Sequence, residues 1–421
     1  MRTTTWMPRA AAVLCAGVLL AGCSDTADDQ PTAKSGGDAS AAAVDPAALD
    51  TGSYPTSPAP EFGRATDATI VEVEGQRLAE FTIVPFEIDA QLTSPGTPGK
   101  VLRSGKEFRS ISSEAADILA NDKMLYGYQT NASTPTATNT DPSKSVLHAV
   151  LRFNNAQDAA KAAREIHTQL TTVDTGAGVK TPETIDILPN TLVSTSESRY
   201  LAGPEVSVNA FTPHGDYLIY TWAKAPAAEK DWTAKTVAKA LDLQAPLIDK
   251  FPAQPTKEQN GGKTAERPMM DQGKVLIYAI PEQDAMEAQF GDDMAAYGPR
   301  GMAHRSINPP LTYRVLTETG SQHNAVAKTV VYRAKDDAGA QRIFDEWIND
   351  LKSQGFADAP SPQGLSNATC VTQDTVQGTA DYCLVVKGRY VGEAHALDNK
   401  KDADQQISAQ YLILEKANQN A

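Results

Sequence analysis

The sequence predicts an α+β protein of two similar modules that follow a signal peptide and a disordered tether. Three observations support this prediction: a short apolar stretch near the N-terminus, a polar region directly after it, and one order of strands and helices that occurs twice. The length agrees, because a single hydrophobic core rarely grows beyond about 250 to 300 residues. A chain of 421 residues is therefore expected to divide.

The first 22 residues have the organisation of a lipoprotein signal peptide. Arg2 and Arg9 form a short positive region, and residues 10–21 form an apolar stretch. That stretch is too short to cross a membrane, which takes roughly 20 helical residues. It ends in small residues followed by Cys23, as expected for cleavage before a cysteine that receives lipid. We expect residues 1–22 to be removed and acyl chains such as palmitate on Cys23 to hold the exported protein on the outer face of the cell membrane. An ordinary secretory signal with an incidental cysteine is the alternative.

Residues 23–60 are predicted to be a flexible tether. They are rich in Ala, Ser, Thr, Asp, Pro and Gly, a composition that cannot bury a core. The whole chain carries a formal net charge of −14. An acidic surface repels phosphate backbones and anionic head groups, so we expect no nucleic-acid partner. Membrane attachment is expected through the lipid instead of a basic patch.

A break over 252–268 divides the remainder, because this segment is rich in turn formers and lacks apolar periodicity. The first α+β module is expected over 61–251 and the second over 269–421. Each shows the order strand, helix, strand, helix, hairpin, helix, which favours a duplicated module. The alternative is that an α+β chain gives a few such matches by chance.

The predicted elements follow from apolar runs that end at turn formers or at a proline, which cannot continue a strand ladder. In the first module they are a strand over 78–84 ending at Pro85, a strand over 146–153, a helix from Asp158, a hairpin strand at 216–220 and a closing helix over 232–243. Their counterparts are a strand over 274–280 ending at Pro281, a strand over 327–332, a helix from Asp337, a hairpin strand at 381–386 and a closing helix over 404–414.

Three segments carry a family resemblance. They read Leu-Asp-Thr-Gly-Ser-Tyr-Pro-Thr at 49–56, Glu-Gly-Gln-Arg-Leu-Ala-Glu-Phe at 74–81 and Pro-Phe-Glu-Ile-Asp at 85–89. They resemble secreted lipoproteins of mycolic-acid-bearing actinobacteria that carry a domain of unknown function. The resemblance implies an envelope location. It implies no activity and supplies no catalytic residues.

Two Asp-Thr-Gly triplets, beginning at Asp50 and Asp174, match the pattern of two-lobed aspartic peptidases. That chemistry needs two carboxylates close enough to share one proton. Asp50 lies in the predicted tether and Asp174 follows a predicted helix, so the triplets are not at equivalent points of the two modules. We interpret them as turn sequences.

The remaining motifs do not predict a metal site, a cofactor or a catalytic residue. The six histidines show no pair spaced two or four residues apart, and no Cys-x-x-Cys accompanies them. No Gly-x-Ser-x-Gly elbow is present. His304 lies among flexible and basic residues in a predicted loop, where it could help to hold an anion. A solvated loop is the alternative.

A disulfide is predicted between Cys370 and Cys383. They are the cysteines that remain once Cys15 leaves with the signal and Cys23 is acylated. Export places them where disulfides persist. A turn at Gly378 allows a hairpin to bring them side by side. Buried free thiols and a catalytic dithiol are the alternatives.

Together these observations predict a non-enzymatic envelope lipoprotein that binds an unknown envelope ligand or protein. Grooves between paired modules are ordinary places for ligands, and whether these two modules share one is left open by the sequence. Two other functions remain open from the sequence: an envelope hydrolase with a dispersed active site, and a structural envelope scaffold.

Overall fold

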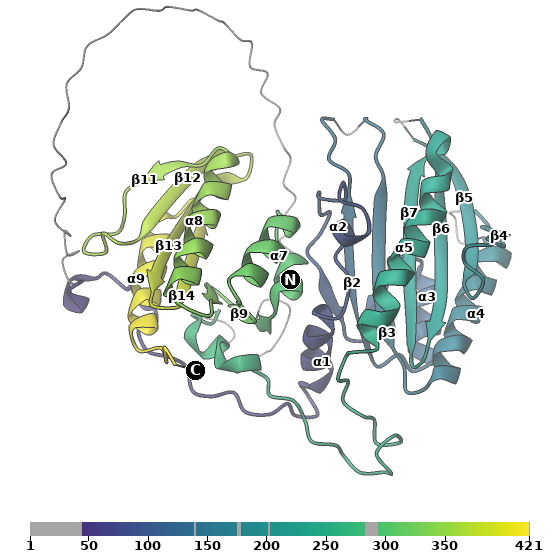
Figure 1. Ribbon diagram of the computed structural model, residues 1–421, viewed down its shortest axis with the longest axis horizontal. Helices are drawn as coiled ribbons and strands as arrows, with labels where there is room; N and C mark the ends of the chain where they lie inside the picture. The colour runs from purple at the N-terminus through teal and green to yellow at the C-terminus, as the bar shows by residue number, and fades with distance from the viewer. Residues whose placement is uncertain (1–43, 139, 175–177, 201–202, 283–293, 421) are drawn as a thin grey trace, which may run out of the picture.

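A computed structural model describes residues 44–420, apart from 139, 175–177, 201–202 and 283–293. The predicted signal peptide and Cys23 lie outside the described residues. Figure 1 shows two sheets side by side, each with helices packed against it. The fold is α+β with two similar modules, as the sequence predicts. No helix in the described part of the chain is long and apolar enough to span a membrane.

The first module contains a seven-stranded antiparallel sheet in the order β1-β2-β3-β7-β6-β5-β4. Its strands are β1 (Lys100–Leu102), β2 (Tyr126–Ser133), β3 (Ser145–Arg152), β4 (Thr181–Glu183), β5 (Leu192–Tyr200), β6 (Gly203–His214) and β7 (Tyr217–Pro226). Its helices are α1 (Ile70–Ala79), α2 (Pro85–Ile88), α3 (Ser113–Asn121), α4 (Ala156–Thr172) and α5 (Lys230–Ile248).

The second module contains a sheet in the order β8-β9-β10-β14-β13-β12-β11, again antiparallel throughout. Its strands are β8 (Ala295–Tyr297), β9 (His323–Val326), β10 (Val330–Arg333), β11 (Ala357–Ala359), β12 (Thr369–Thr375), β13 (Gly378–Lys387) and β14 (Tyr390–Leu397). Its helices are α6 (Pro299–Ala303), α7 (Pro309–Glu318), α8 (Asp337–Ser353) and α9 (Lys400–Glu415). Counted within each module, the strand order is identical, which confirms the duplication.

Equivalent helices begin in the same way in both modules. The side chain of Asn155 caps α4 by accepting a hydrogen bond from the backbone of Asp158. Asp336 caps α8 on Gly339 in the same manner. Such caps satisfy backbone N–H groups that the helix itself leaves unpaired. Helices α4 and α8, each of 17 residues, cover one face of their sheet. The closing helices α5 and α9 pack on the other face (Figure 1).

Two predicted strands are wrong. Residues 78–84 contain the end of α1, where Leu78 and Ala79 are buried, and Pro85 begins α2 as its first residue instead of ending a strand. Where a strand over 274–280 was predicted, residues 272–274 and 276–278 form short 3-10 turns. The carboxylate of Asp271 explains these turns, because it accepts the backbone N–H groups of three successive residues, 275–277, at 2.9 to 3.1 Å.

The predicted match between the two hairpin strands is displaced by one strand. Residues 216–220 lie at the start of β7, whereas residues 381–386 lie in β13, which is the counterpart of β6. Backbone register gives the correct match. Tyr217 faces Arg152 across β7 and β3, and Tyr390 faces Arg333 across β14 and β10.

Part of the predicted tether is packed on the second module. Residues 44–60 lie along α9 and the strands beside it. The hydroxyl of Tyr54 donates to Asp402 at 2.6 Å, and the amide of Gln405 donates to Asp50 at 2.9 Å. Leu49 packs against the core that contains both cysteines of the second module. This segment is polar in composition, but it contains a few apolar and aromatic residues that contact the second module.

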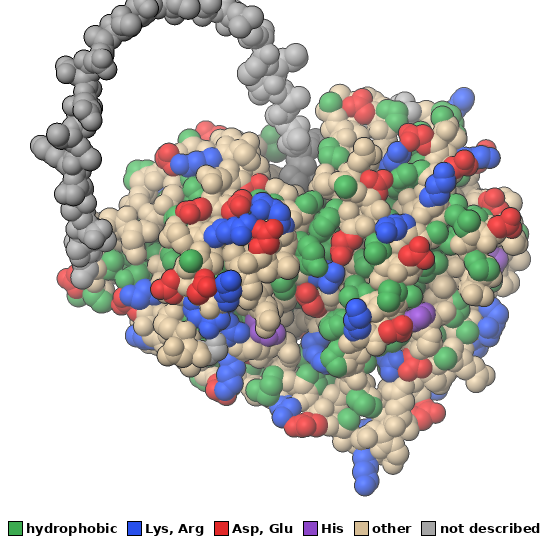
Figure 2. Space-filling model, viewed as in Figure 1, with side chains coloured by type: hydrophobic (Ala, Val, Ile, Leu, Met, Phe, Trp, Pro, Cys, Tyr) green, Lys and Arg blue, Asp and Glu red, His purple; other side chains and the backbone are tan. Residues whose placement is uncertain are grey.

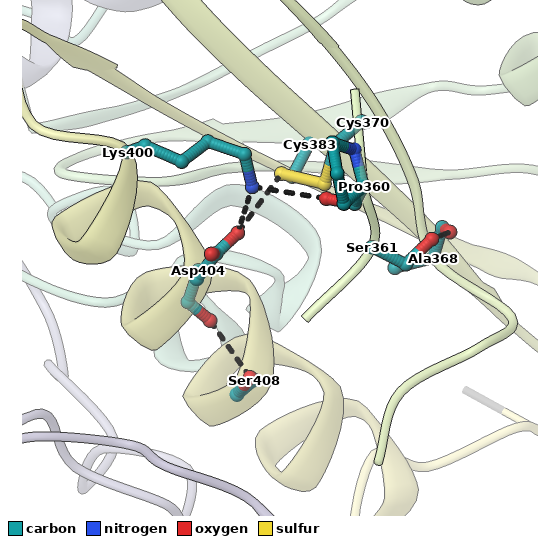
Figure 3. Close-up of a disulfide and its surroundings, with 8 residues drawn as sticks. All are labelled: Pro360, Ser361, Ala368, Cys370, Cys383, Lys400, Asp404 and Ser408. Atoms are coloured by element: carbon teal, nitrogen blue, oxygen red, sulfur yellow. Dashed lines mark hydrogen bonds and ion pairs between the residues drawn. A yellow bond between two sulfur atoms is a disulfide. The ribbon is translucent and has the colours of Figure 1, made fainter. Parts of the chain in front are cut away.

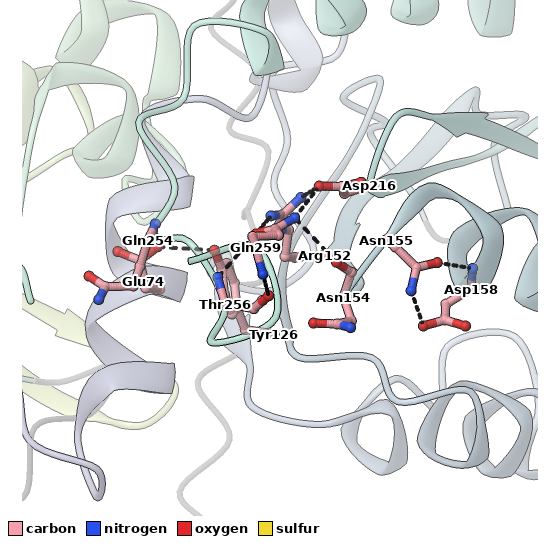
Figure 4. A network of polar contacts seen from close by, with 10 residues as sticks. All are labelled: Glu74, Tyr126, Arg152, Asn154, Asn155, Asp158, Asp216, Gln254, Thr256 and Gln259. Carbon is pink, nitrogen blue, oxygen red and sulfur yellow. Dashed lines mark hydrogen bonds and ion pairs between the residues drawn. The ribbon is translucent and has the colours of Figure 1, made fainter. Parts of the chain in front are cut away.

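The two modules share a hydrophobic cluster. Leu78 and Tyr128 of the first module join Tyr297, Met302 and Trp347 of the second in it. Helix α1 contacts both β2 and β8, which places it between the sheets (Figure 1). The predicted linker is also tied to the first module, as Figure 4 shows. The backbone of Gln254 donates to Glu74 at 2.7 Å, and Gln259 donates to Asp216 at 2.8 Å.

Candidate ligand-binding pocket

A cavity of about 270 Å³ opens in the second module between α7, α8 and the sheet. It therefore lies within one module and not in a groove between the two. Its apolar wall comes from α6, α7 and α8, from strands β9 and β10, and from the turn before α7. These residues are Met302, Ile307, Leu311, Val326, Val330 and Leu351. Three aromatic rings and a carboxyl group also line it: Tyr332, Trp347, Tyr382 and Glu393. The remaining lining residues are polar or charged: Arg305, Ser306, Thr312 and Asp350.

The strand register places the polar and aromatic side chains on the face of the sheet that lines the cavity. Glu393 of β14 faces Val330 on one side and Leu384 on the other. Side chains two residues apart on a strand share a face, so Tyr332 and Val330 both point toward the cavity. Trp347 comes down from α8 and meets Tyr332 edge to face, with ring centroids 5.4 Å apart. Such contacts fix the rings that form the wall.

Glu393 is the ionisable group at the centre of this lining. The hydroxyl of Tyr332 donates to its Oε2 at 3.0 Å, and Tyr332 is the carboxyl's only hydrogen-bond partner among the described residues. Burial raises the pKa of Glu393 to about 7, although the Tyr332 hydrogen bond opposes the rise. Near neutral pH the carboxyl can therefore act either as a proton donor or as a negative charge.

The other charged groups at the pocket are held by neighbours. Asp350 of α8 accepts hydrogen bonds from Asn308 at 2.7 Å and Gln354 at 2.8 Å. Arg305 places its guanidinium over the ring of Tyr297 and donates to the backbone of Gly99 in the first module. Both contacts turn the basic group toward the junction of the modules.

In the first module, a buried aromatic side chain occupies the equivalent place. Three residues after the matched pair Tyr217 and Tyr390, the strand position of Glu393 is occupied by Tyr220. Tyr220 is buried, packs on Phe211 and Phe108, and donates its hydroxyl to Asn209 at 2.8 Å. Protein atoms thus fill in one module the space that remains open in the other.

A larger hollow of about 450 Å³ lies at the edge of the first module, between turns. Its two charged lining residues, Lys144 and Glu229, form an ion pair at 2.6 Å. The remaining lining residues are small or polar. This hollow lacks the convergent aromatic and carboxyl groups of the second module, so it is the weaker candidate.

On the face shown in Figure 2, acidic and basic side chains are interspersed.

Cys370 and Cys383 are joined by a disulfide. They face each other across β12 and β13, and both are buried. Figure 3 shows the bridge beside α9, where Asp404 lies 3.9 Å from the sulfur of Cys383 and Lys400 binds Asp404. Cys370, Cys383 and Asp404 are the one group of possible metal ligands close enough together in the described chain to hold a metal ion. Two of its ligands are consumed by the disulfide, which leaves no thiolate for a metal.

The other motifs occupy structural positions. Asp50 binds Gln405 beside α9 of the second module, and Asp174 accepts the backbone N–H of Gly178 after α4 of the first module. The loop predicted around His304 is wrong, because His304 ends α6 and is buried between the modules. Its ring contacts the hydroxyl of Thr130 and the carbonyl of Thr82, and burial lowers its pKa to about 4. It is not placed to hold an anion.

Comparison with known families shows which family the chain belongs to. Residues 61–262 match the N-terminal part, and residues 275–417 the C-terminal part, of a domain of unknown function, DUF7373. The chain belongs to the DUF7373 family. The two matched ranges follow the two modules, and the family description assigns no activity to either.

Curated proteins and solved structures add little to this assignment. No curated protein matches the chain. The extracellular domain of PknH from Mycobacterium tuberculosis shares 13% identity at a TM-score of 0.30, with 42% of this chain and 97% of that domain covered. DynU16, a putative protein in the dynemicin biosynthetic locus, shares 9% identity at a TM-score of 0.11, with 65% and 95% covered. Both TM-scores are too low to support a functional argument.

Tyr332, Trp347 and Glu393 were not predicted as site residues from the sequence. One signal was present in the sequence: Glu393 lies in Val-Gly-Glu-Ala-His-Ala, where a charged residue alternates with small ones. That alternation is typical of a strand with one polar face. It does not show that this polar face is covered by α8, because the packing of the helix on the sheet is a tertiary relationship.

Proposed function

We propose that this protein is an exported, lipid-anchored envelope protein whose second module binds a small, largely apolar molecule. The observation that carries the proposal is the pocket between α7 and α8, where an apolar wall surrounds Glu393. Ligand sites typically combine such walls with a few polar groups that orient the ligand. The contrast with the first module supports the proposal, because Tyr220 closes the equivalent space there.

Binding is favoured over catalysis by the arrangement of the lining. A carboxyl with a pKa near 7 is able to transfer protons. Hydrolysis by a side-chain nucleophile also needs a nucleophile beside its base. The described lining offers one serine, Ser306, and its hydroxyl is bound to Thr312 at 2.7 Å. The chemistry that the pocket offers is therefore recognition by one carboxyl group within aromatic and aliphatic walls.

A pocket-filling variant tests this function. Glu393→Tyr introduces the residue that the first module has at this strand position, so it is expected to fill the cavity and leave the fold intact. A fragment screen by NMR on methyl-labelled protein should give ligands that shift the methyl signals of Leu311, Val330 and Leu351. These shifts should disappear in Glu393→Tyr. Fragments that shift no pocket methyls, or that bind both proteins equally, would contradict a binding function for the pocket.

The lipid anchor rests on the sequence around Cys23 and has a separate test. Replacing Cys23 by Ser should abolish acylation, because the thiol is the acceptor. The Cys23→Ser protein should leave the membrane fraction for the medium or the aqueous phase during detergent partitioning. The control is Cys15→Ser, which changes a cysteine inside the predicted signal and should partition with membranes as the parent does. If Cys23→Ser also stays with membranes, the anchor is not at this residue.

A further inference from the structure

The ring and carboxyl groups of the pocket define the chemistry of its occupant. Resting on the proposed binding function, we infer that the pocket takes an ammonium group carried on a short apolar chain. Tyr332, Trp347 and Tyr382 supply aromatic faces and edges around the carboxyl of Glu393, and the pocket also contains the carboxyl of Asp350. Aromatic faces attract cations through the ring quadrupole, most strongly where water is excluded. Aliphatic side chains on α7 and α8 provide the surface for the apolar chain.

The carboxyl has one oxygen held and one available. Tyr332 donates its hydroxyl to Oε2, which fixes the orientation of the group. Oε1 has no hydrogen bond and is not among the buried unpartnered atoms of the described chain, so it is accessible from the cavity. An ammonium beside Oε1 would form a charge-assisted contact inside apolar surroundings, where such contacts are strong.

An anionic ligand fits the same surroundings poorly. It would face Glu393 and, at the rim, Asp350. The positive group nearby, Arg305, lies over the ring of Tyr297 and bonds to Gly99 of the first module. A neutral ligand would gain from the apolar wall but would make no use of the carboxyl charge.

The ionisation of Glu393 provides a distinctive readout. The titratable groups that line the pocket with it are the phenols of Tyr332 and Tyr382, the carboxyl of Asp350 and the guanidinium of Arg305, with His395 stacked on Tyr382. Burial raises the pKa of Tyr382 to about 12, so this phenol stays neutral as pH rises from 6 to 8, and burial lowers the pKa of His395, which disfavours the charged form of its ring. Glu393 itself ionises across this interval. A permanent cation should therefore bind more tightly at pH 8 than at pH 6.

Calorimetric titration of the full-length Cys23→Ser chain tests the inference with three probes of one chain length: hexyltrimethylammonium, hexanol and hexanoate. At pH 8 we expect the ammonium to bind about tenfold or more tightly than hexanol, which corresponds to roughly 1.4 kcal/mol. Its affinity should fall severalfold at pH 6, while that of hexanol stays constant. In Glu393→Gln, which keeps the size of the side chain, the preference and the pH dependence should both disappear.

The outcomes separate the two proposals. If hexanol or hexanoate binds as tightly as the ammonium, or if Glu393→Gln keeps the preference, the ammonium inference is overturned and the binding pocket stands. If no probe binds, or if all three bind equally to Glu393→Tyr, the pocket itself is overturned. Cooperative melting curves of both variants, with midpoints well above the titration temperature at pH 6 and pH 8, establish that any loss arises at the pocket and not from unfolding.

Discussion

Glu393 and Tyr220 occupy the same place in the two sheets. Glu393 lies three residues after the start of β14 and faces Val330 of β10. Tyr220 lies three residues after the start of β7 and faces Ala149 of β3. Tyr220 is buried in a cluster of rings, whereas Glu393 lines a cavity. The first module therefore serves as an internal comparison for the pocket of the second module. The closed first module shows what the pocket of the second would be if its space were filled.

The stability of the protein should depend on the ionisation of Glu393. Its pKa in the folded protein is about 7, above the usual 4.5. The folded state then binds the proton more tightly than the unfolded state. This contribution is fully present below pH 4.5 and is lost as pH rises through 7. Between pH 5 and pH 8, the loss of unfolding free energy should be smaller in Glu393→Gln than in the parent, by about 1 to 3 kcal/mol.

Urea unfolding at the two pH values measures this difference. Glu318→Gln is the control, because Glu318 is exposed on α7 and forms surface ion pairs. Its pH dependence should follow the parent. Equal pH dependence in Glu393→Gln and the parent would show that the carboxyl is not desolvated in the folded state.

Arg300 should hold the two modules together. Its guanidinium donates to both carboxylate oxygens of Glu87, at 2.8 and 3.1 Å, and to the carbonyl of Glu80 at 3.2 Å. Arg300→Ala leaves Glu87 half-buried without its cation. We expect a loss of about 2 to 3 kcal/mol in unfolding free energy.

The matched control for this prediction is Arg314→Ala on α7. Arg314 is 47% exposed and pairs with Glu318 and Glu346 at 3.7 and 3.5 Å. Exposed pairs contribute little, so this change should cost less than about 0.5 kcal/mol. Chemical denaturation compares the two variants. Similar losses in both would mean that the contacts of Arg300 add nothing beyond those of a surface pair.

The disulfide between Cys370 and Cys383 should stabilise the second module. It closes a loop with a sequence separation of 13 residues, for which chain entropy gives about 3 kcal/mol. Intact-mass analysis after alkylation should find no free thiol at these positions until a reductant is added. Reduction should lower the melting temperature, and the double variant Cys370→Ala/Cys383→Ala should reproduce that decrease. Modification of both thiols in unreduced, denatured protein would rule the bond out.

The sequence predicted the parts of this fold that depend on local pattern. The apolar run at 146–153 became β3, and the helical pattern after it became α4, because alternation and helical spacing are local properties. The disulfide was predicted from the expectation of export and from a predicted hairpin, and the bond is present between β12 and β13. Leu78 and Ala79 were misread because an apolar run of this length occurs both in strands and in buried helices. What distinguishes the two here is the contact of α1 with β2 and with the other module.

The pocket could not be predicted, because it results from packing between distant segments. Tyr332, Trp347 and Glu393 come from two strands and a helix, and each residue alone is unremarkable in sequence. The docking of residues 44–60 on α9 was missed for the same reason. Its polar composition is that of a tether, and Tyr54 reaches Asp402 only because the chain passes along that helix.

A crystal structure of the full-length Cys23→Ser chain with hexyltrimethylammonium tests the account most directly. We predict density for the ligand between α7 and α8, with its nitrogen beside Oε1 of Glu393 and near the rings of Trp347 and Tyr382, and no ligand at Tyr220 in the first module. A cavity closed by side chains, or a ligand bound elsewhere while the pocket holds only water, would contradict the assignment of this pocket as the binding site.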